Sequence, residues 1–181
     1  MRIAISGSHR VGKSTLLDAL SAALPGYATL AEPYHSLEEE GYEFSDPPSL
    51  EDFEAQLQRS INDFSEGEAK VVFDRCPADF LAYLATHEDA DDLELDEWLP
   101  RARKAIETLD LILFVPIEAR DRIAFSPSDD EGPARSDVDE KLREILLDNP
   151  FELAVEVLEV AGDPETRFRT ALQRIRGASR R

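Results

Sequence analysis

The sequence predicts an α/β fold with a parallel sheet, because short apolar runs alternate along the chain with longer stretches of helical spacing. The expected strands are residues 2–6, 27–31, 70–73, 109–115 and 155–160. The third and fourth runs are apolar almost throughout, which is typical of strands covered on both faces. The last run alternates polar and apolar residues, so it is expected at a sheet edge or half exposed. Right-handed crossovers are expected to join the parallel strands.

Helices are expected between these strands, where apolar residues recur at helical spacing. Residues 15–24 place four leucines on one side, and Ser49 is a suitable N-cap for residues 50–64. The remaining candidates are residues 79–86, 96–108, 138–147 and 165–175. Two segments fit neither pattern, the acidic and proline-rich loop 41–48 and the segment 116–137. At roughly 20 residues, the second is longer than a usual structureless loop, which indicates a functional lid or disorder.

Size and composition indicate one domain. The chain has 181 residues, within the roughly 100–200 of one domain, and no linker divides it, so we expect a single domain over residues 1–181. The net charge of −19 argues against nucleic acid or an anionic membrane as a partner. No apolar run approaches the roughly 20 residues of a membrane span, and we expect no signal peptide. A single cysteine allows no internal disulfide, so we expect a cytoplasmic protein.

The strongest functional signal is a glycine-rich loop between the first expected strand and the first expected helix. It matches the pattern Gly-x-x-x-x-Gly-Lys-Ser/Thr at every fixed position. The residues expected to bind nucleotide here are Gly7, Ser8, His9, Arg10, Val11, Gly12, Lys13, Ser14 and Thr15. The glycines let backbone N–H groups close around phosphate, and the next helix adds the positive end of its dipole. Lys13 is expected to contact the β- and γ-phosphates of ATP, and Ser14 to bind Mg²⁺. The alternative is a glycine-rich turn that matches the pattern by chance.

A further Mg²⁺ ligand is expected at the end of a neighbouring strand. The apolar run 71–73 ends in Asp74, which is the arrangement of a Walker B strand. Asp74 is therefore expected to hold Mg²⁺ directly or through water. The alternative is an ordinary aspartate that ends a strand.

The glycine-rich loop resembles that of the P-loop NTPases, and two further pairs resemble the nucleoside and nucleotide kinase branch. These pairs are Glu32-Pro33 after the second strand and Asp74-Arg75 after the third. The chain is most similar to small bacterial ATP-binding proteins of the AAA type, akin to the ribosylnicotinamide kinase domain, with deoxynucleoside kinases more distant. The resemblance implies a five-stranded parallel sheet in the order 2-3-1-4-5, helices on both faces and a lid at about 116–137.

The resemblance also implies roles for three residues outside the glycine-rich loop. Glu32 matches the catalytic base of deoxynucleoside kinases, and the alternative is a solvated loop carboxylate. Arg75 corresponds to an arginine that contacts substrate or phosphate, with a surface salt bridge as the alternative. The loop at Gly162 corresponds to one that lies against adenine in related kinases, or it is a plain turn before a helix.

The expected lid departs from this pattern, because an acidic, proline-containing segment at 126–134 replaces the arginine-dense lid of the kinases. Arg135 is the best remaining lid arginine. The expected catalytic residues are Lys13, Glu32, Asp74, Arg75 and Arg135. Two functions fit: an ATP- and Mg²⁺-dependent kinase for a nucleoside, nucleotide or related hydroxyl metabolite, or a nucleotide-binding regulatory ATPase module with little or no acceptor phosphorylation.

Overall fold

The computed structural model of the protein describes residues 1–65, 67–92, 95–118 and 134–178. Its centre is a sheet of five parallel strands in the order β2-β3-β1-β4-β5, which confirms the expected order. The strands are β1 (Arg2–Ser6), β2 (Ala28–Leu30), β3 (Val71–Asp74), β4 (Leu111–Phe114) and β5 (Glu156–Glu159). Most of the expected lid lies outside the described residues, so the lid stays a prediction.

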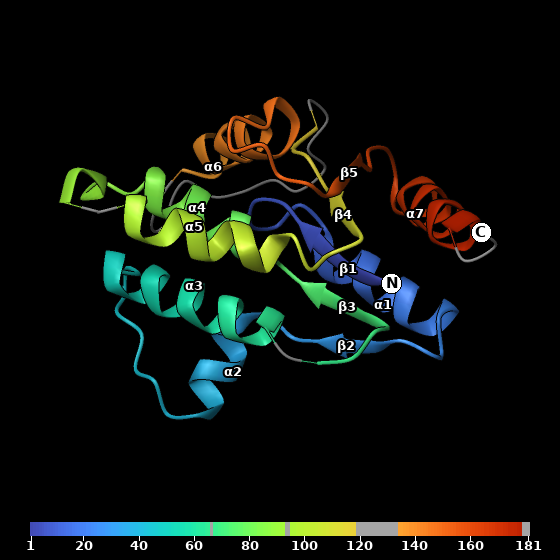
Figure 1. The fold of residues 1–181 in the computed structure, drawn as a ribbon, viewed down its shortest axis with the longest axis horizontal. Coiled ribbons are helices and arrows are strands. Elements are labelled where there is room, and N and C mark those ends of the chain that lie inside the picture. The colour runs from blue at the N-terminus through green and yellow to red at the C-terminus, as the bar shows by residue number, and fades with distance from the viewer. Residues whose placement is uncertain (66, 93–94, 119–133, 179–181) are drawn as a thin grey trace.

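Helices cover both faces of the sheet, giving three layers (Figure 1). One face carries α1 (Lys13–Ala23) and α7 (Pro164–Ala178). The other carries α3 (Leu50–Ser65), α4 (Pro77–Ala85), α5 (Leu95–Ile106), α6 (Arg135–Arg143) and the π-helical turn η3 (Glu144–Asp148). Successive strand residues point to opposite faces of the sheet and pack in different hydrophobic cores. Ile3 and Ile5 of β1 pack toward α1 and α7, whereas Ala4 packs toward α3 and α4. This double coverage explains why the central strands are apolar throughout.

Local sequence signals set where several helices begin. At the start of α3, the Ser49 N–H donates to Asp52 Oδ2 (2.8 Å) and the Asp52 N–H donates to Ser49 Oγ (3.3 Å), a reciprocal capping box. The expected cap at Ser49 is therefore present. Pro77 opens α4 two residues earlier than expected, because proline fits the first helical position. The sequence analysis missed α2 (Pro33–Glu39) and η1 (Ala90–Asp92), which are too short to show a periodic apolar pattern.

The parallel register brings the loops after three strands to one edge of the sheet. Ile5 of β1 lies opposite Asp74 of β3, and Leu30 of β2 lies opposite Phe73. The chain leaving β1, β2 and β3 therefore enters the same region, beyond the carboxyl ends of the strands, where open α/β sheets bind ligands.

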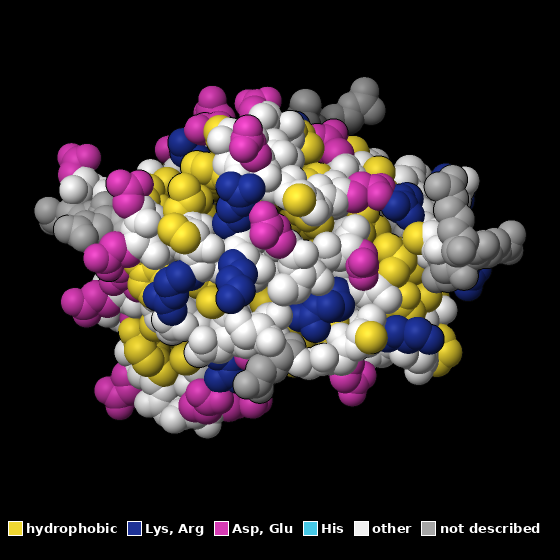
Figure 2. Space-filling view, in the orientation of Figure 1, with side chains coloured by type: hydrophobic (Ala, Val, Ile, Leu, Met, Phe, Trp, Pro, Cys, Tyr) yellow, Lys and Arg dark blue, Asp and Glu magenta, His cyan; other side chains and the backbone are white. Residues whose placement is uncertain are grey.

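On the face of the molecule shown in Figure 2, basic side chains lie nearer the middle and acidic ones mostly around the outline. Basic residues of α3 and α5 are paired with carboxylates: Arg59 lies 2.5 Å from Glu40, and Arg103 lies 3.0 Å from Glu107. Their positive charge is therefore balanced by close neighbours. Among the helices that the structure describes, none combines the length and apolar character needed to cross a membrane.

Candidate functional site

The glycine-rich loop forms a tight turn between β1 and α1, and its backbone conformation depends on glycine at two positions. Gly12 has a φ of 92°, in the left-handed region that glycine adopts without strain. A Cβ atom on Gly7 would lie 2.4 Å from the backbone oxygen of Val115 and 3.0 Å from a methyl group of Val11. The loop therefore packs directly against the chain that leaves β4, with no room for a side chain at its first residue.

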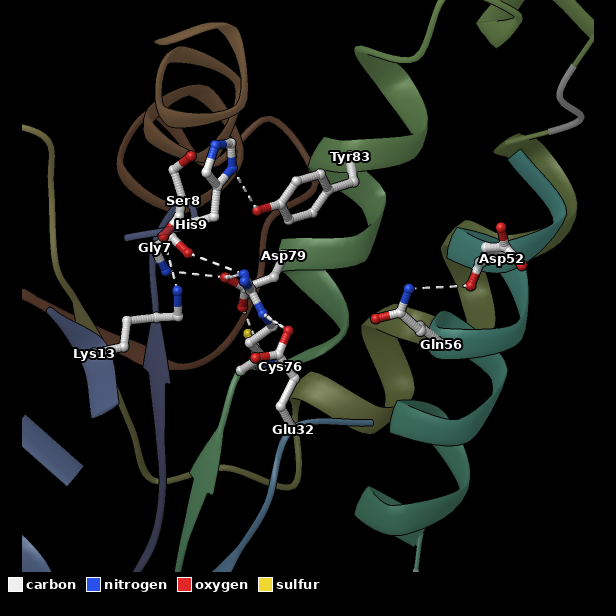
Figure 3. A network of polar contacts seen from close by, with 11 residues as sticks. Gly7, Ser8, His9, Lys13, Glu32, Asp52, Gln56, Cys76, Asp79 and Tyr83 are labelled. Carbon is white, nitrogen blue, oxygen red and sulfur yellow. Dashed lines mark hydrogen bonds and ion pairs between the residues drawn. The ribbon is translucent and has the colours of Figure 1, made fainter. Parts of the chain in front are cut away.

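Lys13, the first residue of α1, folds back along this loop. Its Nζ donates a hydrogen bond to the backbone oxygen of Ser8 (2.7 Å), and the side chain is buried (Figure 3). Burial, followed by the positive charge of Arg75, lowers the pKa of Lys13 to about 8. Ser14 and Thr15, which follow it, are exposed at the start of the helix.

Arg135, the first residue of α6, lies against the same loop although it follows His9 by 126 positions in the sequence. Its Nε donates to the backbone oxygen of His9 (2.9 Å), and its own backbone oxygen accepts a hydrogen bond from Ser8 Oγ (2.9 Å). The structure thus brings the one described arginine of the expected lid segment to the glycine-rich loop.

Glu32 and Arg75 form an ion pair beside the loop, in which the arginine is buried and the glutamate is partly exposed. Arg75 Nε donates to Glu32 Oε1 (2.5 Å), and Arg75 Nη1 donates to the backbone oxygen of Gly7 (3.1 Å). The Arg75 side chain is 7% exposed, so this is not the surface salt bridge considered as an alternative. The backbone of Arg75 has a φ of 73°, a strained conformation that persists only where surrounding contacts hold it.

The two partners of this pair shift each other's ionisation. Burial raises the pKa of Glu32, but the charges of Arg75 and Lys13 outweigh it and the net pKa is lowered. Burial lowers the pKa of Arg75, but Glu32, Tyr83 and Asp79 together outweigh it and the net pKa is raised. Both groups are therefore charged at neutral pH.

Asp74 differs from Glu32, because one of its oxygens has no hydrogen-bond partner among the described residues. Asp74 Oδ1 is buried and accepts no hydrogen bond from the residues that the structure describes. Burial and then the nearby Glu32 raise the pKa of Asp74. A buried carboxylate oxygen with no proton donor costs free energy unless a cation or donor satisfies it, so its surroundings fit the expected Mg²⁺ ligand.

The turn at Gly162, between β5 and α7, is linked to the glycine-rich loop through two charged residues. Gly162 has a φ of 102°, and its N–H donates to the Glu118 carboxylate. Arg167 on α7 donates to the same carboxylate (3.0 Å) and to the backbone oxygen of Val11 (2.6 Å). The structure therefore connects Gly162 to the loop, although through partners that the sequence analysis did not single out.

Two further residues of this site, Asp79 and Tyr83 on α4, were also missed. Asp79 is fully buried, and its Oδ1 accepts a hydrogen bond from the N–H of Gly7 (2.9 Å). The Tyr83 hydroxyl lies 3.3 Å from Nδ1 of His9 (Figure 3). The Arg75 guanidinium lies over the Tyr83 ring at 5.3 Å. Asp79 and Tyr83 are four residues apart and lie on one side of α4, a spacing that the sequence shows, whereas Arg75 precedes the helix.

The site combines a backbone loop that can surround an anion with an ionised carboxylate held close to it. The loop supplies N–H groups and the Lys13 ammonium, which stabilise negative charge. Glu32 is held beside the loop by its ion pair with Arg75, which also binds Gly7. Asp74 ends β3, which lies between β2 and β1 in the sheet, and its Oδ1 has no hydrogen-bond partner among the described residues. Such a site can hold a polyphosphate and a hydroxyl compound next to each other.

Comparisons with known proteins identify the family and the fold of the chain. The family model described as an AAA domain matches residues 2–167, whereas no curated protein sequence matches the chain. Among solved structures, deoxyadenosine kinase from M. mycoides with bound dATP has a TM-score of 0.66 at 14% identity, covering 97% of this chain and 100% of that one. The NadR protein in complex with NR has a TM-score of 0.65 at 22% identity, covering 95% of this chain and 49% of that one. Shikimate kinase from Aquifex aeolicus vf5 has a TM-score of 0.55 at 18% identity, covering 99% and 98%. The resemblance expected from the sequence is confirmed: the chain belongs to the AAA-domain family and has the fold of the P-loop nucleoside and nucleotide kinases.

Proposed function

We propose that the protein is an ATP- and Mg²⁺-dependent kinase that phosphorylates a hydroxyl group of a small molecule, such as a nucleoside, a nucleotide or a related metabolite. The observation that carries this proposal is the contact between the Glu32–Arg75 pair and Gly7 of the glycine-rich loop. An ionised carboxylate this close to a phosphate-binding loop is what phosphoryl transfer to a hydroxyl requires, whereas nucleotide binding alone does not need it.

On the donor side, the glycine-rich loop and Lys13 would bind the phosphates of ATP. Lys13 exchanges its hydrogen bond with the Ser8 oxygen for the β- and γ-phosphates, and Arg135 adds positive charge at the same loop. The turn at Gly162 would lie beside the base. Ser14 and Asp74 would hold Mg²⁺, which neutralises phosphate charge when it is bound.

On the acceptor side, Glu32 would receive the hydrogen bond of the attacking hydroxyl. Phosphoryl transfer passes through a loose transition state, so the acceptor must be in line early and lose its proton late. A carboxylate with a lowered pKa stays ionised at neutral pH, so it can accept the hydrogen bond of the hydroxyl group and take its proton late in the reaction. Arg75 fixes the orientation of Glu32 and balances its charge.

A screen for acceptors tests the proposal. Purified protein is incubated with ATP and Mg²⁺, and ADP formation is followed in the presence of nucleosides, nucleotides and other small alcohols. A kinase releases ADP faster with one class of acceptor and yields the phosphorylated acceptor in equal amount. ADP release that no acceptor accelerates would favour a regulatory ATPase module instead.

The ionisation of Lys13 predicts that ATP binding weakens in alkaline solution. Because the pKa of Lys13 is about 8, its ammonium loses its proton above that pH, and the dissociation constant of ATP should rise toward roughly tenfold per pH unit. Calorimetric titration between pH 6.5 and 9.5 measures this change. Lys13→Arg keeps its charge over the whole range, so its curve should stay flat. Parallel curves for the two proteins would contradict the assignment.

The unsatisfied oxygen of Asp74 predicts a role in Mg²⁺ dependence. Asp74→Asn keeps the shape of the side chain but removes its charge, so the Mg²⁺ concentration for half-maximal ADP formation should rise by about tenfold. ATP binding measured without Mg²⁺ should persist. If the Mg²⁺ titrations of the two proteins coincide, Asp74 only ends β3.

A further inference from the structure

Gly7, the first residue of the glycine-rich loop, has both of its backbone polar groups held by side chains from one short segment. Its N–H donates to Asp79 Oδ1 (2.9 Å), and its C=O accepts from Arg75 Nη1 (3.1 Å). Arg75 lies in the turn between β3 and α4, and Asp79, whose contact with Gly7 is drawn in Figure 3, lies in the first turn of α4. The first residue of the loop is therefore held by the same segment that carries Arg75, the partner of Glu32.

Asp79 is the centre of this arrangement. It is 0% exposed, and each of its carboxylate oxygens has a partner: Oδ1 binds the Gly7 N–H, and Oδ2 accepts from the N–H of Cys76 (2.9 Å), which caps α4. Its Oδ1 also lies 3.7 Å from Arg75 Nη1. One buried carboxylate thus contacts the loop, the helix start and the arginine.

Arg75 extends these contacts to the acceptor side. The same guanidinium that lies beside Asp79 binds Glu32 at 2.5 Å and covers the ring of Tyr83. Its charge is shared between two carboxylates, and its left-handed backbone fixes where the side chain starts. A displacement of Asp79 would move Arg75 and, through it, Glu32.

We infer that Asp79 is a positioning residue that holds the phosphate-binding loop and the Glu32–Arg75 pair in one fixed geometry, without touching nucleotide or acceptor itself. This inference rests on the proposed function and adds a residue to its machinery. Reacting groups must be aligned closely, since a misplacement of about 1 Å can reduce a rate by about 10²-fold. A buried carboxylate with three partners, facing both halves of the site, supplies that alignment.

The chain offers a matched control, because Asp52 occupies the equivalent position at the start of α3. Asp52 is also buried, and it accepts a hydrogen bond from the N–H of its own cap residue, Ser49 (2.8 Å). Its other side-chain hydrogen bonds are with Tyr42 and Ser45, which precede α3. Asp79→Asn and Asp52→Asn therefore both weaken a helix cap, but only the first disturbs the contact with Gly7.

The experiment compares these two variants in ATP binding and thermal unfolding. We expect both to unfold at lower temperature, while the dissociation constant of ATP rises about tenfold for Asp79→Asn and stays within about twofold for Asp52→Asn. Equal ATP affinities in the two folded variants would overturn the inference. If Asp79→Asn does not fold, Asp79→Glu is used in its place, because it keeps a capping carboxylate and its charge but displaces them by one methylene group. Wild-type ATP affinity and turnover in Asp79→Glu would equally overturn the inference.

A double-mutant cycle with Glu32→Gln separates positioning from a purely structural effect. If Asp79 acts through Arg75 on Glu32, Asp79→Asn should reduce kcat by about 10–100-fold when Glu32 is present. The same substitution should reduce kcat by much less in the Glu32→Gln variant. Equal reductions in both backgrounds would contradict the inference. Absence of phosphoryl transfer by the wild type would refute the proposed function, and the ATP-binding comparison would still decide whether Asp79 positions the loop.

Discussion

Replacement of Glu32 by glutamine should reduce the turnover of acceptor phosphorylation by roughly 10²–10⁴-fold, the usual contribution of a general base. Glutamine has nearly the same volume and can still accept a hydrogen bond, but it cannot take the proton of the acceptor. It also leaves the buried Arg75 guanidinium without its carboxylate at 2.5 Å, which loosens the geometry of the pair. Steady-state kinetics with a confirmed acceptor measure the effect.

The affinity for ATP separates this role from others. Glu32 makes no phosphate contact in this mechanism, so the dissociation constant of ATP should stay within a factor of about three of the wild-type value. Glu39→Gln, an exposed change at the end of helix α2, which Glu32 precedes, is the matched control and should behave as the wild type. Joint loss of ATP binding and activity would place Glu32 in the metal shell, and undiminished turnover would remove it from catalysis.

Replacement of Gly7 by alanine should abolish measurable ATP binding, with a loss of at least about 100-fold in affinity. The added Cβ would lie 2.4 Å from the backbone oxygen of Val115, and a backbone atom cannot rotate away as a side chain can. Either the loop or the end of β4 must shift, which breaks the hydrogen bonds that Gly7 makes with Asp79 and Arg75. Over-packing of this kind also lowers the free energy of unfolding by about 1–3 kcal/mol.

Gly26→Ala provides the control for this prediction. A Cβ at Gly26, in the turn between α1 and β2, would meet no atom within 4 Å. We therefore expect wild-type ATP binding and unchanged or slightly higher stability, since alanine restricts the unfolded chain more than glycine does. Calorimetric titration and thermal unfolding of both variants give the comparison. ATP affinity that survives in Gly7→Ala would show that the loop does not need its close contact with β4.

The sequence was sufficient to predict the sheet and the glycine-rich loop, because both depend on local patterns. Continuous apolar runs indicated strands buried on both faces, and fixed spacing of glycine, lysine and serine indicated the loop between β1 and α1. The short helix α2 carries too few turns for a periodic signal, so it was not predicted.

Contacts between distant parts of the chain could not be read from spacing. Glu32 and Arg75 were each singled out, but their pairing joins residues 43 positions apart and depends on β2 and β3 being neighbours in the sheet. The contact of Asp79 with Gly7 spans 72 positions. In the sequence, Asp79 is only an aspartate near the start of a helix, and its burial and its partners follow from the fold.

The most direct test of the central claim is to follow the γ-phosphate of ATP itself. The wild-type protein is incubated with Mg²⁺, ATP labelled in its γ-phosphate, and the acceptor that most accelerates ADP release, and the products are separated. We predict that the label appears on the hydroxyl group of the acceptor in equal amount to the ADP formed, and that Glu32→Gln loses this transfer while still binding ATP. Release of all the label as inorganic phosphate, with none on the acceptor, would contradict the assignment of this site as a kinase.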